Sequence, residues 1–168
     1  MSTEWDHYLI HCYNEANRSS TDPSTQNAAC IVPVGQHREL GTIVLGANHF
    51  PRGVAETEKR WERPGKYFFV EHAERNAIYE AASMGESTYG ATMVSPWAAC
   101  TSCARAIIQS GIVRLVRHRS KEAHAHWNEE IEIGNLMMQE AGIEIVEIDP
   151  IAGYKLRRDG VLVDTGSL

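Results

Sequence analysis

Residues 91–116 read ATMVSPWAACTSCARAIIQSGIVRLV, and this stretch gives the strongest indication of the fold. The short apolar runs at 91–95 and 112–116 have the length and composition of buried strands. Between them, residues 100–110 have helical spacing and end at Gly111, a residue typical of helix ends. A strand, a helix and a strand in succession predict parallel pairing, because the helix supplies the crossover that parallel strands need.

The pattern extends in both directions from this stretch. Further helices are predicted at residues 4–17, 71–84 and 127–141, and further strands at 28–34, 42–47 and 143–148. The first two of these strands are close enough in sequence to form a hairpin. We therefore expect an α/β fold, a three-layer αβα sandwich around a five-stranded mixed sheet.

Two segments lack a regular pattern. Residues 51–68 are charged and contain Pro and Gly, which predicts a long irregular connection of the kind that is often functional. The polar tail at 151–168 gives no indication of an element or a role.

Length and composition indicate one globular domain over residues 1–168. The chain is 43% hydrophobic and 23% charged, which are ordinary values for a folded domain. A net charge of −6 argues against a nucleic-acid partner bound on a broad basic face. The sequence has no apolar run long enough for a membrane helix and no basic start typical of a signal peptide, so we expect a cytoplasmic protein without a membrane partner.

Two short motifs lie at the starts of two predicted helices. The first is His72-Ala73-Glu74, and the second is Cys100-Thr101-Ser102-Cys103. Cysteines three residues apart point to the same side of a helix, and a helix N-terminus favours the thiolate form. If the two helices leave the same edge of neighbouring parallel strands, their first turns meet in a crevice. His72, Cys100 and Cys103 then provide three ligands for Zn²⁺, the arrangement of a catalytic site, and Glu74 is free to act as a base.

Each motif alone has a simpler interpretation. A C-x-x-C pair also occurs in redox sites and as half of a structural zinc site. A structural site needs a fourth ligand, for which His118, His124 and His126 are the candidates. These three histidines fall in a polar loop, so we interpret them as solvated. A non-catalytic zinc module stays open as an alternative.

The segments around the motifs resemble a known family. Residues 71–78 (EHAERNAI) and 100–112 (CTSCARAIIQSGI) follow the H-x-E and C-x-x-C pattern of zinc-dependent nucleobase deaminases. Residues 21–26 (TDPSTQ) and 46–53 (GANHFPRG) are similar to the deoxycytidylate branch. Over about residues 20–118 the chain resembles the cytidine and deoxycytidylate deaminase superfamily, and within it the dCMP deaminases of phages and bacteria.

This resemblance implies an activity and roles for individual residues. It implies zinc-dependent hydrolysis of a free deoxycytidine nucleotide, from dCMP to dUMP and ammonia, with Glu74 carrying the protons. Asn48 matches a residue that hydrogen-bonds the sugar, and Ala73 would offer its backbone N–H to the base carbonyl. Trp97 matches a tryptophan beside the base. Ala99 departs from the family by replacing a proline, which contributes no metal ligand.

The remaining expectations concern phosphate, alternative substrates and assembly. The richest basic cluster lies at residues 52–66 and contains Arg52, Lys59, Arg60, Arg63 and Lys66. Within it, Arg52 is the favoured phosphate ligand, directly or across a subunit boundary. The hydroxyls of Ser20, Thr21, Ser24 and Thr25 are a second candidate. dCTP, cytidine and tRNA adenosine are the alternative substrates. The resemblance also implies a homo-oligomer, with a hexamer favoured.

Overall fold

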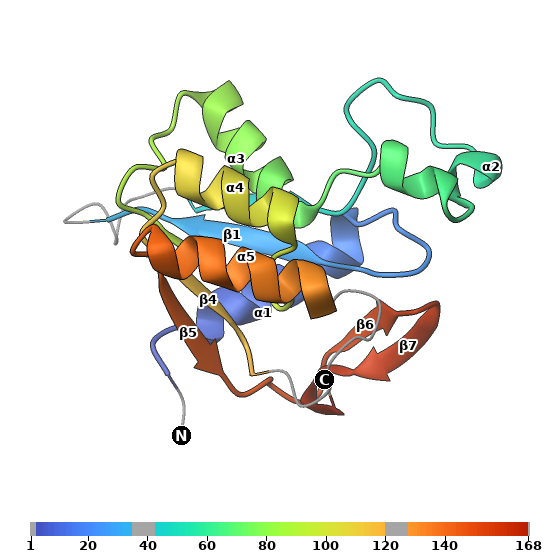
Figure 1. The fold of residues 1–168 in the computed structure, drawn as a ribbon. Coiled ribbons are helices and arrows are strands. Elements are labelled where there is room, and N and C mark those ends of the chain that lie inside the picture. The colour runs from blue at the N-terminus through green and yellow to red at the C-terminus, as the bar shows by residue number, and fades with distance from the viewer. Residues whose placement is uncertain (1–2, 35–42, 120–127, 168) are drawn as a thin grey trace.

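A five-stranded mixed sheet forms the centre of the protein (Figure 1). The computed structural model describes residues 3–34, 43–119 and 128–167. The strands are β1 (Ala28–Val32), β2 (Val44–Ala47), β3 (Thr92–Val94), β4 (Arg114–His118) and β5 (Glu144–Ile148), in the spatial order β2-β1-β3-β4-β5. β1 pairs antiparallel with β2 and β3, whereas β3, β4 and β5 are parallel. The predicted hairpin and the predicted parallel pairing are both confirmed.

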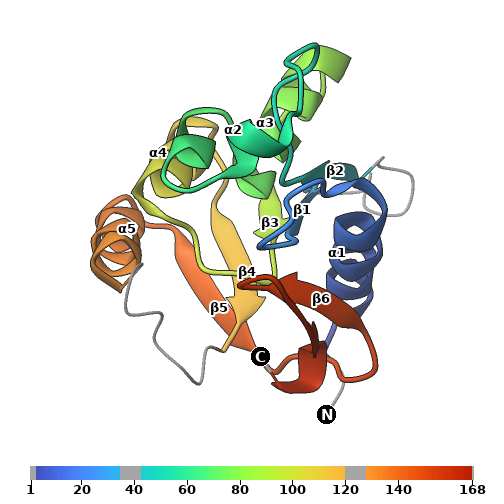
Figure 2. The ribbon, with the colours of Figure 1, turned by 90° about the vertical axis from the view of Figure 1, so that its right-hand side faces the viewer.

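Helices cover both faces of this sheet (Figure 2). One face carries α3 (Ala73–Met84), α4 (Thr101–Gln109) and α5 (Asn128–Glu140), and the other carries α1 (Asp6–Ser19). Each face has its own apolar core, one centred on the alanines of α3 and the other on α1. The predicted αβα sandwich is therefore confirmed. Within the ranges that the structure describes, no helix combines the length and the apolar character needed to cross a membrane.

Helix α3 lies unusually close to strand β2. A Cβ atom at Gly46 of β2 would lie 2.2 Å from the backbone nitrogen of Ala77 and 2.7 Å from the carbonyl oxygen of Ala73. Only glycine allows this approach, since real Cβ contacts of this length do not occur. The close packing fixes the first turn of α3 against the sheet.

One detail of the predicted topology needs correction. The two motif-bearing helices do not follow neighbouring parallel strands, because β1 lies between β2 and β3. β2 and β3 still point the same way, since each is antiparallel to β1. The starts of α3 and α4 therefore lie at the same edge of the sheet, and the two helices pack side by side across β1.

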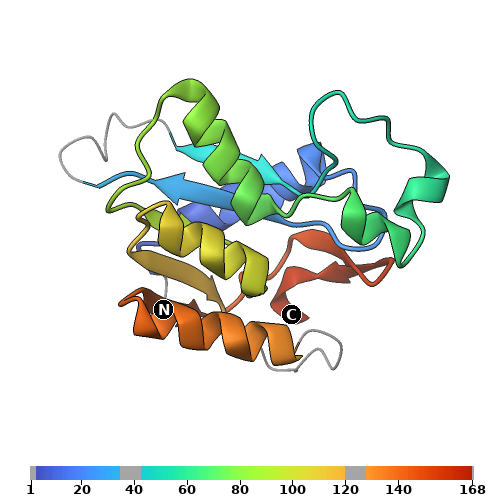
Figure 3. The ribbon, with the colours of Figure 1, turned by 45° about the horizontal axis from the view of Figure 1, so that its top comes forward.

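The tail, for which the sequence indicated no element, forms a hairpin. β6 (Lys155–Arg158) and β7 (Val161–Asp164) pair antiparallel, and a 3₁₀ turn, η3 (Thr165–Ser167), follows. Leu156 is fully buried in the core beside α1. The hairpin lies at the end of the sheet where β3 and β4 terminate (Figure 3).

The connection at residues 51–68 contains two short helical segments, α2 (Glu58–Trp61) and η2 (Gly65–Phe68). The ring of Phe50 packs against Trp61, with centroids 4.2 Å apart, and this contact anchors the connection. Lys66 of η2 is buried, with its ammonium group 2.8 Å from a carboxylate oxygen of Asp22. The segment is thus held against the loop that follows α1.

Candidate active site

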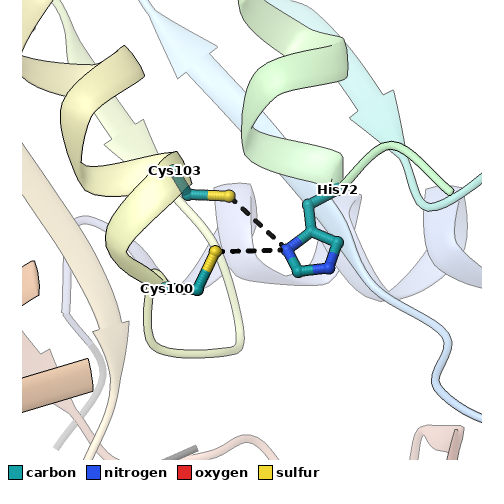
Figure 4. A group of neighbouring side chains, drawn as sticks. All are labelled: His72, Cys100 and Cys103. Carbon is teal, nitrogen blue, oxygen red and sulfur yellow. Dashed lines mark hydrogen bonds between the residues drawn. The ribbon is translucent and has the colours of Figure 1, made fainter. Parts of the chain in front are cut away.

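Three side chains with metal-binding atoms meet at the N-termini of α3 and α4 (Figure 4). His72 immediately precedes α3, Cys100 immediately precedes α4, and Cys103 lies in the first turn of α4. Their donor atoms all lie within 4.8 Å of one another. Nδ1 of His72 is 3.6 Å from the Sγ atom of each cysteine. The structure therefore brings together the three ligands that the sequence predicted.

These distances fit one tetrahedral zinc ion. Zn–S bonds of about 2.3 Å and Zn–N bonds of about 2.0–2.1 Å place a nitrogen and a sulfur ligand about 3.6 Å apart. Both observed N–S distances are 3.6 Å. Imidazole and thiolate are the donors that zinc prefers, and three protein ligands leave one position for water or substrate. The residues present fit a catalytic zinc ion.

The two cysteines differ in their protonation. The pKa of Cys100 is lowered to about 3, because Cys103 donates a hydrogen bond to its sulfur and His72 adds to this stabilisation, against the opposing effect of burial. The same hydrogen bond, together with burial and the nearby Glu74, raises the pKa of Cys103 well above its ordinary value. The two pKa shifts therefore have opposite directions, which favours the thiolate at Cys100 and the thiol at Cys103, and a metal ion binds both sulfurs as thiolates.

Glu74 lies beside the metal-binding group in the first turn of α3. Its Oε2 atom is 3.6 Å from the Sγ atom of Cys103, and the residue is 2% exposed. Burial raises the pKa of its carboxyl group, His72 opposes this effect and the charge of Cys100 adds to it. A raised pKa suits a carboxyl group that takes up and releases protons near neutral pH.

Asn48 links the end of β2 to the start of α3. Its Oδ1 atom accepts a hydrogen bond from the N–H of Ala73 at 2.8 Å, and its Nδ2 atom donates to the carbonyl oxygen of Thr25 at 3.0 Å. The arrangement differs from the predicted role of Ala73, because its N–H is already used by Asn48 rather than offered to a base. Among the described contacts, Nδ2 of Asn48 uses one of its two hydrogens, so it can also donate to a ligand.

The residues favoured for phosphate binding lie away from the metal-binding group. The hydroxyl of Ser20 and the N–H of Thr21 both donate to the carbonyl oxygen of Asn48, at 3.0 and 3.1 Å, and so position that residue. Arg52 is exposed and lies 3.2 Å from the carboxylate of Glu80. Arg52, Ser20 and Thr21 do not line the cavity described next, whereas Thr25 of the hydroxyl candidates and Arg63 and Lys66 of the basic cluster do. A contact from Arg52 across a subunit boundary stays a prediction.

The metal-binding group opens into a cavity of about 370 Å³. This volume falls in the range of about 300–1,000 Å³ typical of small-molecule sites. Trp97 lines the cavity, and its indole N–H donates to the carbonyl oxygen of Gln26 at 3.1 Å. A fixed aromatic ring in the same cavity as Glu74 and His72 suits stacking against a planar base.

His118 is not the solvated loop residue that the sequence suggested. It ends β4, is 5% exposed, and its Nε2 atom is 2.6 Å from the hydroxyl of Tyr13. Burial lowers the pKa of its ring to about 4, so the ring is neutral at pH 7. It is not part of the metal-binding group, which contains three residues in the described part of the chain. His124 and His126 lie outside the described residues.

Sequence reasoning missed several residues of the cavity wall. Asn27, Arg158 and Asp159 line the cavity. Arg158 and Asp159 come from the C-terminal hairpin, and Arg63 of the predicted basic cluster lines the cavity with them. Arg63 and Asp159 are at least half exposed, and we call the part of the wall formed by Arg63, Arg158 and Asp159 the cavity mouth. No local pattern marks Asn27, Arg158 or Asp159, because tertiary packing alone brings them to the cavity.

A zinc-binding trio with one open position, beside a buried carboxyl group that is not a ligand, defines the class of zinc-dependent deaminases when it lies at the helix starts of an αβα sandwich. Comparison with known proteins agrees with this class. A sequence model of the cytidine and deoxycytidylate deaminase zinc-binding region matches residues 3–119. The chain belongs to the cytidine and deoxycytidylate deaminase family.

Individual relatives support the same assignment, and a solved structure shares the fold. The chain is 31% identical over 153 residues to the deoxycytidylate deaminase of Mus musculus, covering 88% of this chain and 81% of the relative. It is 30% identical over 146 residues to an uncharacterized deaminase of Aliivibrio fischeri, covering 86% and 94% of the two chains. The dCMP deaminase of cyanophage S-TIM5, solved in complex with dCMP and dUMP, has a TM-score of 0.66 at 23% identity, covering 88% of this chain and 99% of the other. This last likeness shows the shared fold.

Proposed function

We propose that the protein catalyses the hydrolytic deamination of dCMP to dUMP and ammonia. The single observation that carries the proposal is the grouping of His72, Cys100 and Cys103 around a common point, with the Glu74 carboxyl group beside them at the cavity. The names of the relatives support the choice of substrate, since the mouse relative is a deoxycytidylate deaminase.

The position of Glu74 supports a role for this residue in the proton transfers. When bound by the three ligands, zinc would supply Lewis acidity that makes water a nucleophile at neutral pH. Glu74 takes a proton from the attacking water and delivers it to N3 of the cytosine ring while C4 becomes tetrahedral. It then takes the remaining proton of the same water from the new hydroxyl group on C4 and delivers it to the exocyclic amino group. The bond between C4 and this nitrogen breaks, ammonia leaves, and C4 becomes a carbonyl carbon. One carboxyl group serves both steps because it is next to the metal-binding group without belonging to it.

Two further residues orient the nucleotide. Asn48 is fixed by hydrogen bonds from Ala73 and to Thr25, and it can direct its second amide hydrogen to a sugar hydroxyl or to the base. The ring of Trp97 provides an apolar face for the base. Rigid support of this kind holds a substrate in a reactive geometry.

An activity assay distinguishes dCMP from the alternative substrates. A panel of dCMP, dCTP, deoxycytidine, cytidine and a tRNA anticodon stem is incubated with the zinc-loaded protein, and ammonia release is measured. We expect the highest kcat/KM with dCMP. The net charge of −6 argues against the tRNA substrate. Ammonia from none of the five, with stoichiometric zinc present, would refute the proposal and favour a non-catalytic zinc module.

We also propose that residues 1–168 fold as one domain and that the protein is a cytoplasmic homo-oligomer, with a hexamer favoured. Exposed apolar side chains on two helices support self-association, namely Tyr79 and Met84 of α3 and Ile133 and Leu136 of α5. Sedimentation velocity gives the number of subunits. A monomer at micromolar concentration would contradict the assembly.

A further inference from the structure

Four cationic side chains line the cavity: two are nearly buried in its wall, and two belong to its mouth. The four are Arg63, Lys66, Arg117 and Arg158. Lys66 is 5% exposed and lies 2.8 Å from the carboxylate of Asp22, so this pair is part of the cavity wall. Arg117 is 10% exposed and lies 2.9 Å from the carboxylate of Glu147. Arg63 and Arg158 belong to the cavity mouth.

We propose that Arg158 of the C-terminal hairpin, together with Arg63, binds the 5′-phosphate of the nucleotide substrate at the cavity mouth. The inference rests on the proposed function and deepens it, because it makes the hairpin responsible for selecting a nucleoside monophosphate over a nucleoside. Guanidinium groups bind phosphate through paired N–H donors. A protein with a net charge of −6 has to place such donors locally to hold a doubly charged anion.

The hairpin has a fixed position relative to the base end of the cavity. The N–H of Gln26 donates to the carbonyl oxygen of Arg157 at 2.9 Å, and the N–H of Arg157 donates to Oε1 of Gln26 at 3.0 Å. At the hairpin turn, the N–H of Gly160 donates to the carbonyl oxygen of Ser24 at 2.9 Å. The carbonyl oxygen of Gln26 also accepts the indole N–H of Trp97. One hydrogen-bonded unit therefore joins the hairpin to the ring that faces the base.

Arg158 connects the mouth directly to that ring. Its guanidinium carbon lies 5.4 Å from the centroid of the Trp97 ring, within the range of a cation–π contact. Stacking fixes the plane of a guanidinium group, while its N–H donors point outward from the edge of that plane. With a base against Trp97, a phosphate on the same nucleotide lies on the solvent side, where Arg158 and Arg63 line the cavity.

The carboxylate of Asp159 competes with phosphate for the guanidinium group of Arg63. Its carboxylate is 3.6 Å from the guanidinium of Arg63, and both side chains are at least half exposed. An exposed ion pair at this distance is weak, so a doubly charged phosphate displaces the carboxylate. We therefore expect opposite effects for two adjacent residues. Loss of Arg158 weakens phosphate binding, and loss of the Asp159 charge strengthens it.

The test compares Arg158→Gln with Lys155→Gln, an exposed residue on the same strand that does not line the cavity. With zinc-loaded protein, we expect Arg158→Gln to raise KM for dCMP about 10- to 100-fold with little change in kcat. Turnover of deoxycytidine, which lacks the phosphate, is unchanged. Lys155→Gln behaves as wild type, and Asp159→Asn lowers KM for dCMP about 2- to 5-fold.

A binding measurement separates this inference from the proposed function. Calorimetric titration with dUMP and with deoxyuridine reports phosphate recognition without turnover. We expect Arg158→Gln to weaken dUMP binding about 10- to 100-fold and leave deoxyuridine binding unchanged. Arg63→Gln, on a different element, gives a second and independent loss. Equal dUMP affinity in wild type and Arg158→Gln overturns the inference, whereas an absence of ammonia from dCMP with normal dUMP binding overturns only the proposed function.

Discussion

Replacing Gly46 by alanine tests whether the contact between β2 and α3 positions the metal ligands. The new Cβ atom would lie 2.2 Å from the backbone nitrogen of Ala77, where ordinary contacts begin at about 3.5 Å. The helix therefore has to move by about 1.3 Å, the difference between these values. His72 precedes this helix and shares the movement, while Cys100 and Cys103 stay on α4.

We expect Gly46→Ala to lower the free energy of unfolding by about 1–3 kcal/mol, the usual cost of overpacking. A displacement of about 1 Å at a reacting centre costs about 100-fold in rate, so kcat/KM for dCMP falls by about that factor. Zinc content by mass spectrometry and ammonia release are the assays. Gly65→Ala is the matched control, because a Cβ atom there meets nothing within 4 Å. Normal zinc binding and turnover in Gly46→Ala would refute the reasoning.

Three further predictions concern single groups. Glu74→Gln keeps zinc bound and lowers kcat about 10²- to 10⁴-fold, the usual contribution of a positioned acid–base group, and retained turnover contradicts its role. The pKa of His118 is about 4 in the folded protein, against an ordinary value of 6.5. The unfolded chain therefore takes up this proton first as the pH falls. The free energy of unfolding decreases between about pH 6.5 and pH 4, by about 3 kcal/mol in total. Urea unfolding across this range checks the slope, which His118→Gln should flatten. Lys66→Met leaves the buried Asp22 carboxylate unpaired and costs about 3–5 kcal/mol, and adding Asp22→Asn should recover most of this loss in thermal unfolding.

The architecture could be predicted because its signals are local. Helices end at glycines such as Gly85 and Gly142, which adopt the left-handed conformation that other residues avoid. Strands such as β1 are buried throughout, so they read as continuous apolar runs. The order of elements then left few arrangements of the sheet.

The hairpin formed by β6 and β7 could not be predicted in the same way. Of its strand residues Leu156 alone is buried, so the segment lacks the alternation that marks a half-buried strand. Its packing depends on a space beside α1 that exists only in the folded protein. The same reason explains His118, whose burial is set by Tyr13 of α1, far away in the sequence.

Some residues of the candidate site could be predicted from the sequence, and others depend on tertiary packing. His72, Glu74, Cys100 and Cys103 lie at helix starts, so the two motifs, the expected α/β topology and the resemblance to zinc-dependent deaminases together predicted their grouping. The phosphate expectation relied on the basic cluster at 52–66. The chain carries Arg52 of this cluster toward Glu80, whereas Arg63 of the same cluster and Arg158 of the distant C-terminal hairpin supply the cations of the cavity mouth.

The attachment of the C-terminal hairpin to Gln26 has a consequence for synthesis of the protein. A nascent chain that has emerged to β5 already contains every metal ligand and the whole central sheet. It still lacks Arg158 and Asp159 of the cavity mouth. Translation thus completes the metal-binding group first and the residue that we propose for phosphate binding last.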